Sequence, residues 1–262
     1  MDMYRFIIRL AFVSLILFIG LGSDYPESNA QVASISTTLP ELRSEILEQL
    51  LEQKPEISLS YDGDRAELSK QFPALIRDTF AANDYIAYIV DSYLYTIRTW
   101  GTSAKIKLTI TYRETAEQTR HVDQLINQVL PSIVVDKMDP LEKVTYIHDW
   151  IVEHVAYDTT LQRYTAMDAL ETGSAVCQGY SLLAYRMLSH AGVESRIVEG
   201  KVDSGSHVWN LVRLNNGWHH MDVTWDDPLP DRPGKVSHTY FLVNDRFMRQ
   251  DHSWEKAYPM TR

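Results

Sequence analysis

The only cysteine of this 262-residue chain, Cys177, stands near the start of a predicted helix. Ser174 is a good N-cap residue, apolar residues recur at helical spacing from Tyr180 onward, and Gly192 supplies a C-terminal stop. Cys177 would then lie in the first turn, where backbone N–H groups lack helical partners and the helix dipole is positive. Both features favour a thiolate over a thiol, and the same N–H groups could hold an oxyanion after the sulfur attacks a carbonyl carbon. A buried, unreactive cysteine at a helix start is the alternative.

A predicted β-hairpin carries an imidazole and a carboxylate that could activate this thiol. Residues 206–214 and 218–225 have the composition of strands, and the sequence Asn-Asn-Gly at 215–217 predicts a turn between them. His207 lies in the first strand and Asp222 in the second. In thiol acyl transfer a carboxylate orients an imidazole, and the imidazole takes the proton of the thiol.

The register of this hairpin decides whether His207 and Asp222 meet. If Asn215 and Asn216 form the turn, Asp222 lies diagonal to His207 on the same face, about 7–8 Å away between backbones and within side-chain reach. If residues 216 and 217 form the turn, Asp222 lies four residues along the strand, roughly 13 Å away at ~3.3 Å per residue. Asn-Gly is the stronger local turn signal, whereas the chemistry favours the first register. We predict the first register, or a bulged variant with the same outcome.

Capping signals and hydrophobic periodicity predict the elements around these residues. A capping box at 115–118 opens a helix that should stop at Pro131, and Asp139 opens another whose buried face includes His148. The sequence pattern over residues 31–114 predicts a smaller α/β region with two helices. Pro73 argues against the first half of the second helix. Its helices are predicted at 38–53 and 66–81, and its strands at 56–61, 85–90, 93–100 and 105–113, the last two joined as a hairpin.

Several separate motifs, in one order along the chain, resemble the transglutaminase-like superfamily. The resemblance is closest to its bacterial secreted branch, which has a papain-like Cys-His-Asp core. It covers about residues 138–255. The matching motifs are a helix at 143–158, Ala-Val-Cys-Gln-Gly-Tyr at 175–180, His-Val-Trp-Asn at 207–210, His-Met-Asp-Val-Thr-Trp-Asp-Asp-Pro at 220–228, and a tail with Tyr-Phe-Leu-Val-Asn-Asp at 240–245 and His-Ser-Trp at 252–254.

The resemblance implies roles for individual side chains. Cys177 would be the nucleophile, His207 the general base and then the general acid, and Asp222 the orienting carboxylate. Animal transglutaminases carry Trp directly after the nucleophile, and this chain has Gln there, which puts protein cross-linking in doubt but leaves thiol acyl transfer untouched. Three further residues are candidates for the site wall or for oxyanion support, and each could equally be structural: Gln178, Tyr157 and Trp209.

The fold implied by the resemblance is α+β. A papain-like, transglutaminase-like core at 115–262, with the nucleophile helix packed on an antiparallel sheet, would follow the α/β region at 31–114. The implied activity is thiol acyl transfer on peptide or glutamine amides through a thioester, released to water by a peptidase or amidase, or to an amine by a transglutaminase. The alternative is a non-catalytic peptide-binding or scaffold module of the same fold. The implied partner is a peptide or protein substrate, with cell-surface or wall peptides among the candidates.

Composition and spacing argue against several other classes of function. The chain has 35 acidic and 25 basic residues and a formal charge of −10, which is the wrong sign for a nucleic-acid binder. One cysteine excludes a disulfide framework and a multi-cysteine zinc site. His148 and His154 lie six residues apart on different helix faces, while His219 and His220 are adjacent on a strand and point to opposite faces. We therefore expect no metal site and no cofactor.

The amino terminus predicts a targeting segment. Residues 10–22 carry no charge and follow Arg5 and Arg9. As a helix this run would span roughly 20 Å, short of the ~30 Å hydrocarbon core. Small residues at 28 and 30 fit a signal peptidase site, so we predict that residues 1–30 are a cleaved signal peptide. An uncleaved membrane anchor over residues 5–22 is the alternative, and either places the protein outside the cytoplasm.

Overall fold

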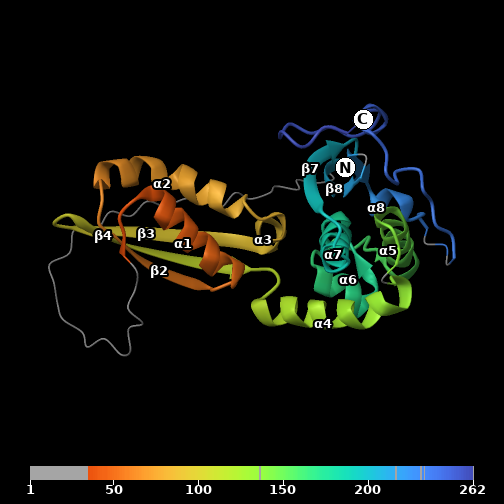
Figure 1. The fold of residues 1–262 in the computed structure, drawn as a ribbon, viewed down its shortest axis with the longest axis horizontal. Helices are drawn as coiled ribbons and strands as arrows, with labels where there is room; N and C mark the ends of the chain where they lie inside the picture. The colour runs from red at the N-terminus through yellow and green to blue at the C-terminus, as the bar shows by residue number, and fades with distance from the viewer. Residues whose placement is uncertain (1–34, 136, 216, 231, 233, 262) are drawn as a thin grey trace. The chain divides into compact units, whose positions relative to one another are not determined.

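The computed structural model describes five stretches of the chain, drawn in colour in Figure 1: 35–135, 137–215, 217–230, 232 and 234–261. These residues divide into an amino-terminal unit, 35–116, and a carboxy-terminal unit, 117–261. The predicted signal peptide or anchor lies outside the described residues, and the domain boundary predicted after residue 114 stays a prediction. Within these stretches, no helix is both long and apolar enough to cross a membrane.

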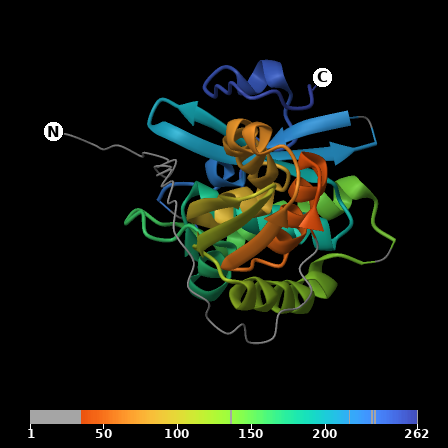
Figure 2. The ribbon, with the colours of Figure 1, turned by 90° about the vertical axis from the view of Figure 1, so that its left-hand side faces the viewer.

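The amino-terminal unit is a four-stranded sheet with helices packed on one face (Figures 1 and 2). The strand order is β1-β2-β4-β3; β1 runs parallel to β2, and the other pairs are antiparallel. Its elements are β1 (Ile35–Ser36), α1 (Leu39–Leu51), β2 (Glu56–Tyr61), α2 (Arg65–Phe80), α3 (Asp84–Ile89), β3 (Val90–Trp100) and β4 (Ser103–Tyr112).

Alternation along the strands puts one face of this sheet in the core. On β4, Ala104, Ile106, Leu108 and Ile110 are buried, while the residues between them are exposed. The apolar stripes of α1 and α2 cover that face, as the period-2 and period-3.6 patterns require. The predicted strand at 56–61 and the predicted hairpin are confirmed by the pairing of β2 with β4 and of β3 with β4.

Three sequence predictions about element boundaries are wrong. Residues 84–89 form helix α3 rather than a strand, because the Asn83 side chain accepts a hydrogen bond from the backbone N–H of Ile86 and caps the helix against the strand preference of its residues. Helix α2 runs unbroken through Pro73. Helix α4 (Ala116–Ile133) passes Pro131 and ends two residues later.

The carboxy-terminal unit has the predicted α+β core. Helix α7 packs on β7 and β8 of a three-stranded antiparallel sheet with the order β7-β8-β9 (Figure 1). The apolar stripe of α7 is buried, from Tyr180 to Leu188. After α4 the elements are α5 (Pro140–His154), β5 (Ala156–Tyr157), α6 (Ala166–Thr172), β6 (Ser174–Ala175), α7 (Cys177–His190), β7 (Ser195–Val202), β8 (Gly205–Leu214), β9 (Gly217–Met221), α8 (Val223–Asp226) and α9 (Asp245–Met248).

Candidate active site

Cys177 is the first residue of α7, and backbone contacts set the turn before it. The N-cap residue is Val176, which makes no side-chain cap, so the prediction that Ser174 caps the helix is wrong. Ser174 instead pairs with Ala156 in the parallel β5–β6 ladder, and the Val176 N–H donates to the Arg163 carbonyl at 2.8 Å. Cys177 is partly exposed. Cys177 therefore stands at a fixed helix start and is not fully buried.

Gly179 lets this first turn sit close to its neighbours. A Cβ atom at this position would lie 2.6 Å from the Ala175 Cβ and 3.0 Å from the Thr165 carbonyl oxygen. Both neighbours belong to the backbone framework that leads into α7, so neither can move away freely.

Gly179→Ala is expected to destabilise the protein by about 1–3 kcal/mol, because the added methyl overpacks this contact. Helix propensity alone predicts the opposite sign, since alanine is favoured over glycine by about 1 kcal/mol inside a helix. The free energies of unfolding of the wild type and Gly179→Ala, measured in urea, show which of the two effects is larger. A variant more stable than the wild type would show that α7 has room at this position.

Two hydrogen bonds hold α7 against the strand that carries His207. The Ser181 hydroxyl donates to the Val208 carbonyl at 3.1 Å, and the Asn210 side-chain amide donates to the Ser181 carbonyl at 3.1 Å. Ser181 lies one turn after Cys177, and Val208 directly follows His207. These contacts fix the first turn of α7 beside the start of β8.

His207 and Asp222 form a buried pair. His207 Nε2 lies 2.6 Å from Asp222 Oδ2, and the two residues are only 5% and 0% exposed. Leu214 pairs with Gly217, which confirms the first of the two predicted registers. Because Asp222 binds Nε2, Nδ1 is the ring nitrogen left for Cys177, and the proximity of Cys177 helps to raise the pKa of His207.

Asp222 ends the sheet and begins the next helix. Its Oδ1 accepts from the backbone N–H groups of Thr224 at 3.1 Å and Trp225 at 3.2 Å, so Asp222 is the N-cap of α8. The predicted return strand to residue 225 is wrong for this reason: β9 stops at Met221 and the chain turns into α8. One carboxylate thus caps a helix with one oxygen and faces His207 with the other.

Charge stabilises the pair strongly. Burial opposes protonation of His207, but the negative charge of Asp222, its hydrogen bond and the contact with Cys177 outweigh that cost and raise the pKa of His207 to about 10. Burial likewise raises the pKa of Asp222, but His207 and His252 overcome it and lower the pKa to about 2. At neutral pH the ionised Asp222 can only accept hydrogen bonds, so His207 Nε2 carries a proton.

Comparison with known proteins identifies this part of the chain. Residues 127–223, which contain Cys177, His207 and Asp222, match the family model of the transglutaminase-like superfamily. These residues belong to that superfamily. Kyphoscoliosis peptidase from mouse is 29% identical over 150 residues, or 48% of this chain, and the human protein is 30% identical over 154 residues, or 50% of this chain. The chain covers 23% of the length of each of these relatives.

Solved structures align with parts of this chain at low similarity. The crystal structure of a TGase aligns with a TM-score of 0.40 and 16% identity, covering 70% of this chain and 55% of that chain. An arylamine N-acetyltransferase from Bacillus cereus, described with a Cys-His-Glu catalytic triad, aligns with a TM-score of 0.32 and 13% identity, covering 39% of this chain and 48% of that chain.

A second histidine of the carboxy-terminal unit binds Asp222. His252 is 3% exposed, and its Nε2 lies 3.1 Å from Asp222 Oδ2, the same oxygen that faces His207. Its Nδ1 lies 2.6 Å from Asp251 Oδ1. The next residue, Ser253, pairs through its backbone with Lys201 of β7, which holds this tail segment against the sheet. In the sequence, the signal for His252 was the tail motif His-Ser-Trp at 252–254, and no role was predicted for this histidine.

The three weaker candidates lie in different settings within the transglutaminase-like domain. Tyr157 on β5 is half-buried and pairs with Ala175, two residues before Cys177, and burial is the main cause that raises its pKa to about 12. Gln178 is the second residue of α7 and is half-buried. Trp209 is 1% exposed, stacks on the His207 ring at 5.8 Å and donates its Nε1–H to His220 Nδ1 at 2.8 Å. The Trp209 indole therefore packs against one face of the His207 ring.

The free energy of unfolding is expected to include a contribution from this pair that is greatest between about pH 3.8 and 6.5. His207 has its pKa raised from 6.5 to about 10 on folding, so its contribution is full below pH 6.5 and is lost as the pH rises through 10. Asp222 has its pKa lowered from 3.8 to about 2, so its contribution is present above pH 3.8 and is lost as the pH falls through 2.

Urea unfolding of the wild type and His207→Gln as a function of pH checks this expectation. The stability difference between the two proteins should narrow as the pH rises from 6.5 toward 10. A difference that stays constant over this range would mean that the pair carries no net charge interaction.

Proposed function

We propose that the transglutaminase-like domain is a thiol acyl-transfer enzyme that acts on peptide or glutamine amides. One observation carries the proposal: Asp222 holds His207 through Nε2, which leaves the other ring nitrogen to serve Cys177, a partly exposed residue at the start of α7. In this proposal Cys177 is the nucleophile, His207 is the base and then the acid, and Asp222 orients and charges the imidazole. No cofactor takes part.

The proposed reaction transfers one acyl group in two steps. The Cys177 sulfur attacks the amide carbonyl carbon after its proton passes to His207 Nδ1, and the C–N bond then breaks as the leaving amine takes that proton. The acyl group remains on the sulfur as a thioester. Water or a second amine next attacks the thioester, His207 accepts the proton of the attacking group, and the proton returns to the sulfur as the product leaves.

The start of α7 supplies the electrostatic support that this reaction needs. A negative oxygen develops on the carbonyl in each step, and the N–H groups in the first turn of a helix point toward such a charge. The helix dipole favours the same charge. Asp222 stabilises the imidazolium that forms while the oxyanion exists, as carboxylates do in triads of this type.

Hydrolysis and amine transfer differ only in the group that accepts the acyl chain. The proposed triad serves both, and exclusion of water from the thioester would favour an amine. The relatives carry the name peptidase, which supports hydrolysis as the first reaction to test.

The purified protein should be offered a glutamine-bearing peptide with and without a fluorescent primary amine. Cleaved or deamidated peptide identifies a hydrolase, and fluorescent peptide identifies a transglutaminase; Cys177→Ala should form neither. Binding of the peptide without any product in the wild type would support the non-catalytic peptide-binding or scaffold module and overturn the proposed enzyme.

We include an extracytoplasmic location in the proposal, supported by the uncharged run near the amino terminus. Peptides of the cell surface or wall would then be the accessible substrates. Fractionation of cells that produce the tagged full-length chain tests this point, and recovery of the protein in the cytoplasm alone would refute it.

His252 is expected to position Asp222 for the proposed reaction. His252→Ala removes one of two hydrogen bonds to Asp222 Oδ2, and a bond to a charged group is worth about 1.5–3 kcal/mol, so kcat should fall roughly 10- to 100-fold. The alkaline and acid limbs of the pH–rate profile should shift, because Asp222 then holds the imidazole less firmly. His220→Ala is the matched control, since His220 is also buried but contacts Trp209 and Asp245 instead. If the two variants lose kcat equally and both keep the pH–rate profile of the wild type, His252 contributes to packing only.

A further inference from the structure

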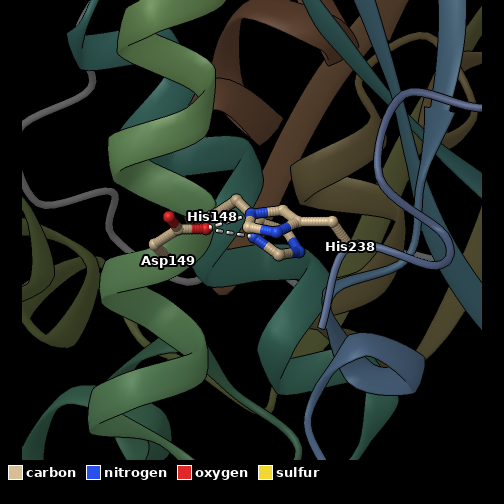
Figure 3. Close-up of side chains that lie close together, drawn as sticks. All are labelled: His148, Asp149 and His238. Atoms are coloured by element: carbon tan, nitrogen blue, oxygen red, sulfur yellow. Dashed lines mark hydrogen bonds and ion pairs between the residues drawn. The ribbon is translucent and has the colours of Figure 1, made fainter. Parts of the chain in front are cut away.

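Three possible metal ligands converge in the carboxy-terminal unit, and none of them belongs to the proposed triad. His148 and Asp149 project from α5, and His238 comes from the segment between α8 and α9 (Figure 3). His148 Nδ1 lies 2.8 Å from Asp149 Oδ1, and His238 Nε2 lies 2.7 Å from the same oxygen. One ligand atom from each residue lies within 4.8 Å of the others. The two imidazole rings lie alongside each other with the carboxylate at one end (Figure 3).

A second carboxylate fixes the orientation of the buried histidine. His148 Nε2 lies 3.2 Å from Asp226 Oδ2, and both side chains are 0% exposed. Asp226 Oδ1 in turn accepts from the Tyr240 backbone N–H at 2.9 Å. Histidines that bind metals commonly have their other ring nitrogen bound to a carboxylate, which sets the tautomer and aims the ligating nitrogen. His148 has that arrangement, with Nδ1 aimed at Asp149, the carboxylate that His238 also contacts.

The ligand types and the charges suit a divalent transition metal. Two imidazoles and one carboxylate favour Zn²⁺ and related ions, whereas Ca²⁺ and Mg²⁺ prefer sets of oxygen ligands. The two negative charges of Asp149 and Asp226 match the charge of such an ion. The side chains of Asp149 and His238 are 31% and 44% exposed, so an ion can enter and keep water in an open position.

The spacing of the ligand atoms needs only a small adjustment. Metal–ligand bonds of ~2.0–2.1 Å place tetrahedral ligands roughly 3.3 Å apart, slightly farther than the present hydrogen-bond distances. His238 is half-exposed and lies outside helix and strand, so it can move outward by a fraction of an ångström while His148 stays in place.

We propose that His148, Asp149 and His238 bind one divalent transition-metal ion, with Zn²⁺ as the best chemical match, and that Asp226 supports the site through His148. The ion would join α5 to the segment after α8, and none of its three ligands takes part in the proposed acyl transfer. This inference revises the expectation of no metal site, which considered histidines close in sequence; His238 lies 90 residues from His148 and meets it only through the fold.

Zinc and cobalt titrations of the purified protein test the proposal. A Cys177→Ala background removes the thiol as a competing ligand. This parent should bind one equivalent of Zn²⁺, gain thermal stability from it, and give the visible absorption of Co²⁺ in a tetrahedral or five-coordinate nitrogen and oxygen site. His238→Ala and Asp149→Asn, both at partly exposed positions, should each weaken Zn²⁺ at least tenfold and lose the thermal shift.

Two further variants locate the ion. His154→Ala, at an exposed position on the same helix, should bind Zn²⁺ as the parent does, because His154 Nδ1 contacts the Trp150 carbonyl oxygen and its ring stacks on Trp150 in the same turn of α5. His207→Ala should also retain the site, since His207 belongs to the separate buried cluster with Asp222 and His252. Absence of stoichiometric binding in the parent, equal binding in His238→Ala, or loss of binding in His207→Ala would each overturn the proposal.

Discussion

Replacing Cys177 with alanine is expected to abolish acyl transfer, with a fall in the rate of about 10⁴-fold or more. The proposed thioester cannot form without the sulfur, and whatever rate remains would come from binding and oxyanion support alone. Cys177→Ser should lose nearly as much, because a hydroxyl does not ionise beside His207 as a thiol does. Fold integrity is not at risk, since Cys177 is a small, partly exposed residue at a helix start whose turn is set by backbone contacts.

Single-turnover kinetics measure this effect most clearly. The wild type should accumulate an acyl-enzyme that denaturation traps on Cys177, and neither variant should. A Cys177→Ala protein that releases product at a rate near that of the wild type would place the chemistry on other residues and remove the basis of the proposed mechanism.

Asp222→Asn is expected to lower kcat by about 10⁴-fold while the fold persists. The asparagine oxygen can still accept from the amides of Thr224 and Trp225 and cap α8. Its NH₂ group, however, would face two imidazole nitrogens that now donate to a carboxylate oxygen. His207 would then adopt the wrong tautomer and lose the negative charge that raises its pKa, which is the reason for losses of this size in related triads.

Asp245→Asn is the matched control for this prediction. Asp245 also binds a buried histidine, with its Oδ1 2.9 Å from His220 Nε2, but that pair does not contact the proposed triad. Melting temperatures and kcat should therefore separate the two variants: both should lose stability, because each replaces a carboxylate bound to a buried histidine, but only Asp222→Asn should lose kcat by orders of magnitude. Similar kcat values in the two variants would mean that Asp222 serves only to cap α8.

Local sequence signals predicted the hairpin and the helices well where the whole segment agreed with them. The apolar stripe of α7, the capping box at Asp139 and the alternation along β4 all lie where periodicity placed them. The hairpin register was not decided by the turn signal, since Asn-Gly favoured the other pairing. The chemical requirement that an imidazole reach a carboxylate selected the register that the strands have.

The errors occur where a contact distant in sequence overrides a local preference. Ser174 is a good cap in isolation, but β5 recruits it into a ladder, and the backbone of Val176 begins the helix instead. His252 and His238 reach their partners through tail and loop segments without periodic patterns, so no spacing rule could connect them to Asp222 or to α5. These long-range contacts follow from the packed fold and cannot be read from neighbouring residues.

Alkylation of the protein as a function of pH tests the proposed activation of Cys177 most directly, because the chain has a single cysteine and every adduct reports on it. The rate with iodoacetamide should already be high at pH values well below ~8.5, the ordinary pKa of a thiol, and this reactivity should disappear in His207→Ala. A rate that rises only near pH 8.5, and that is the same in both proteins, would show that the imidazole does not take the proton of the sulfur.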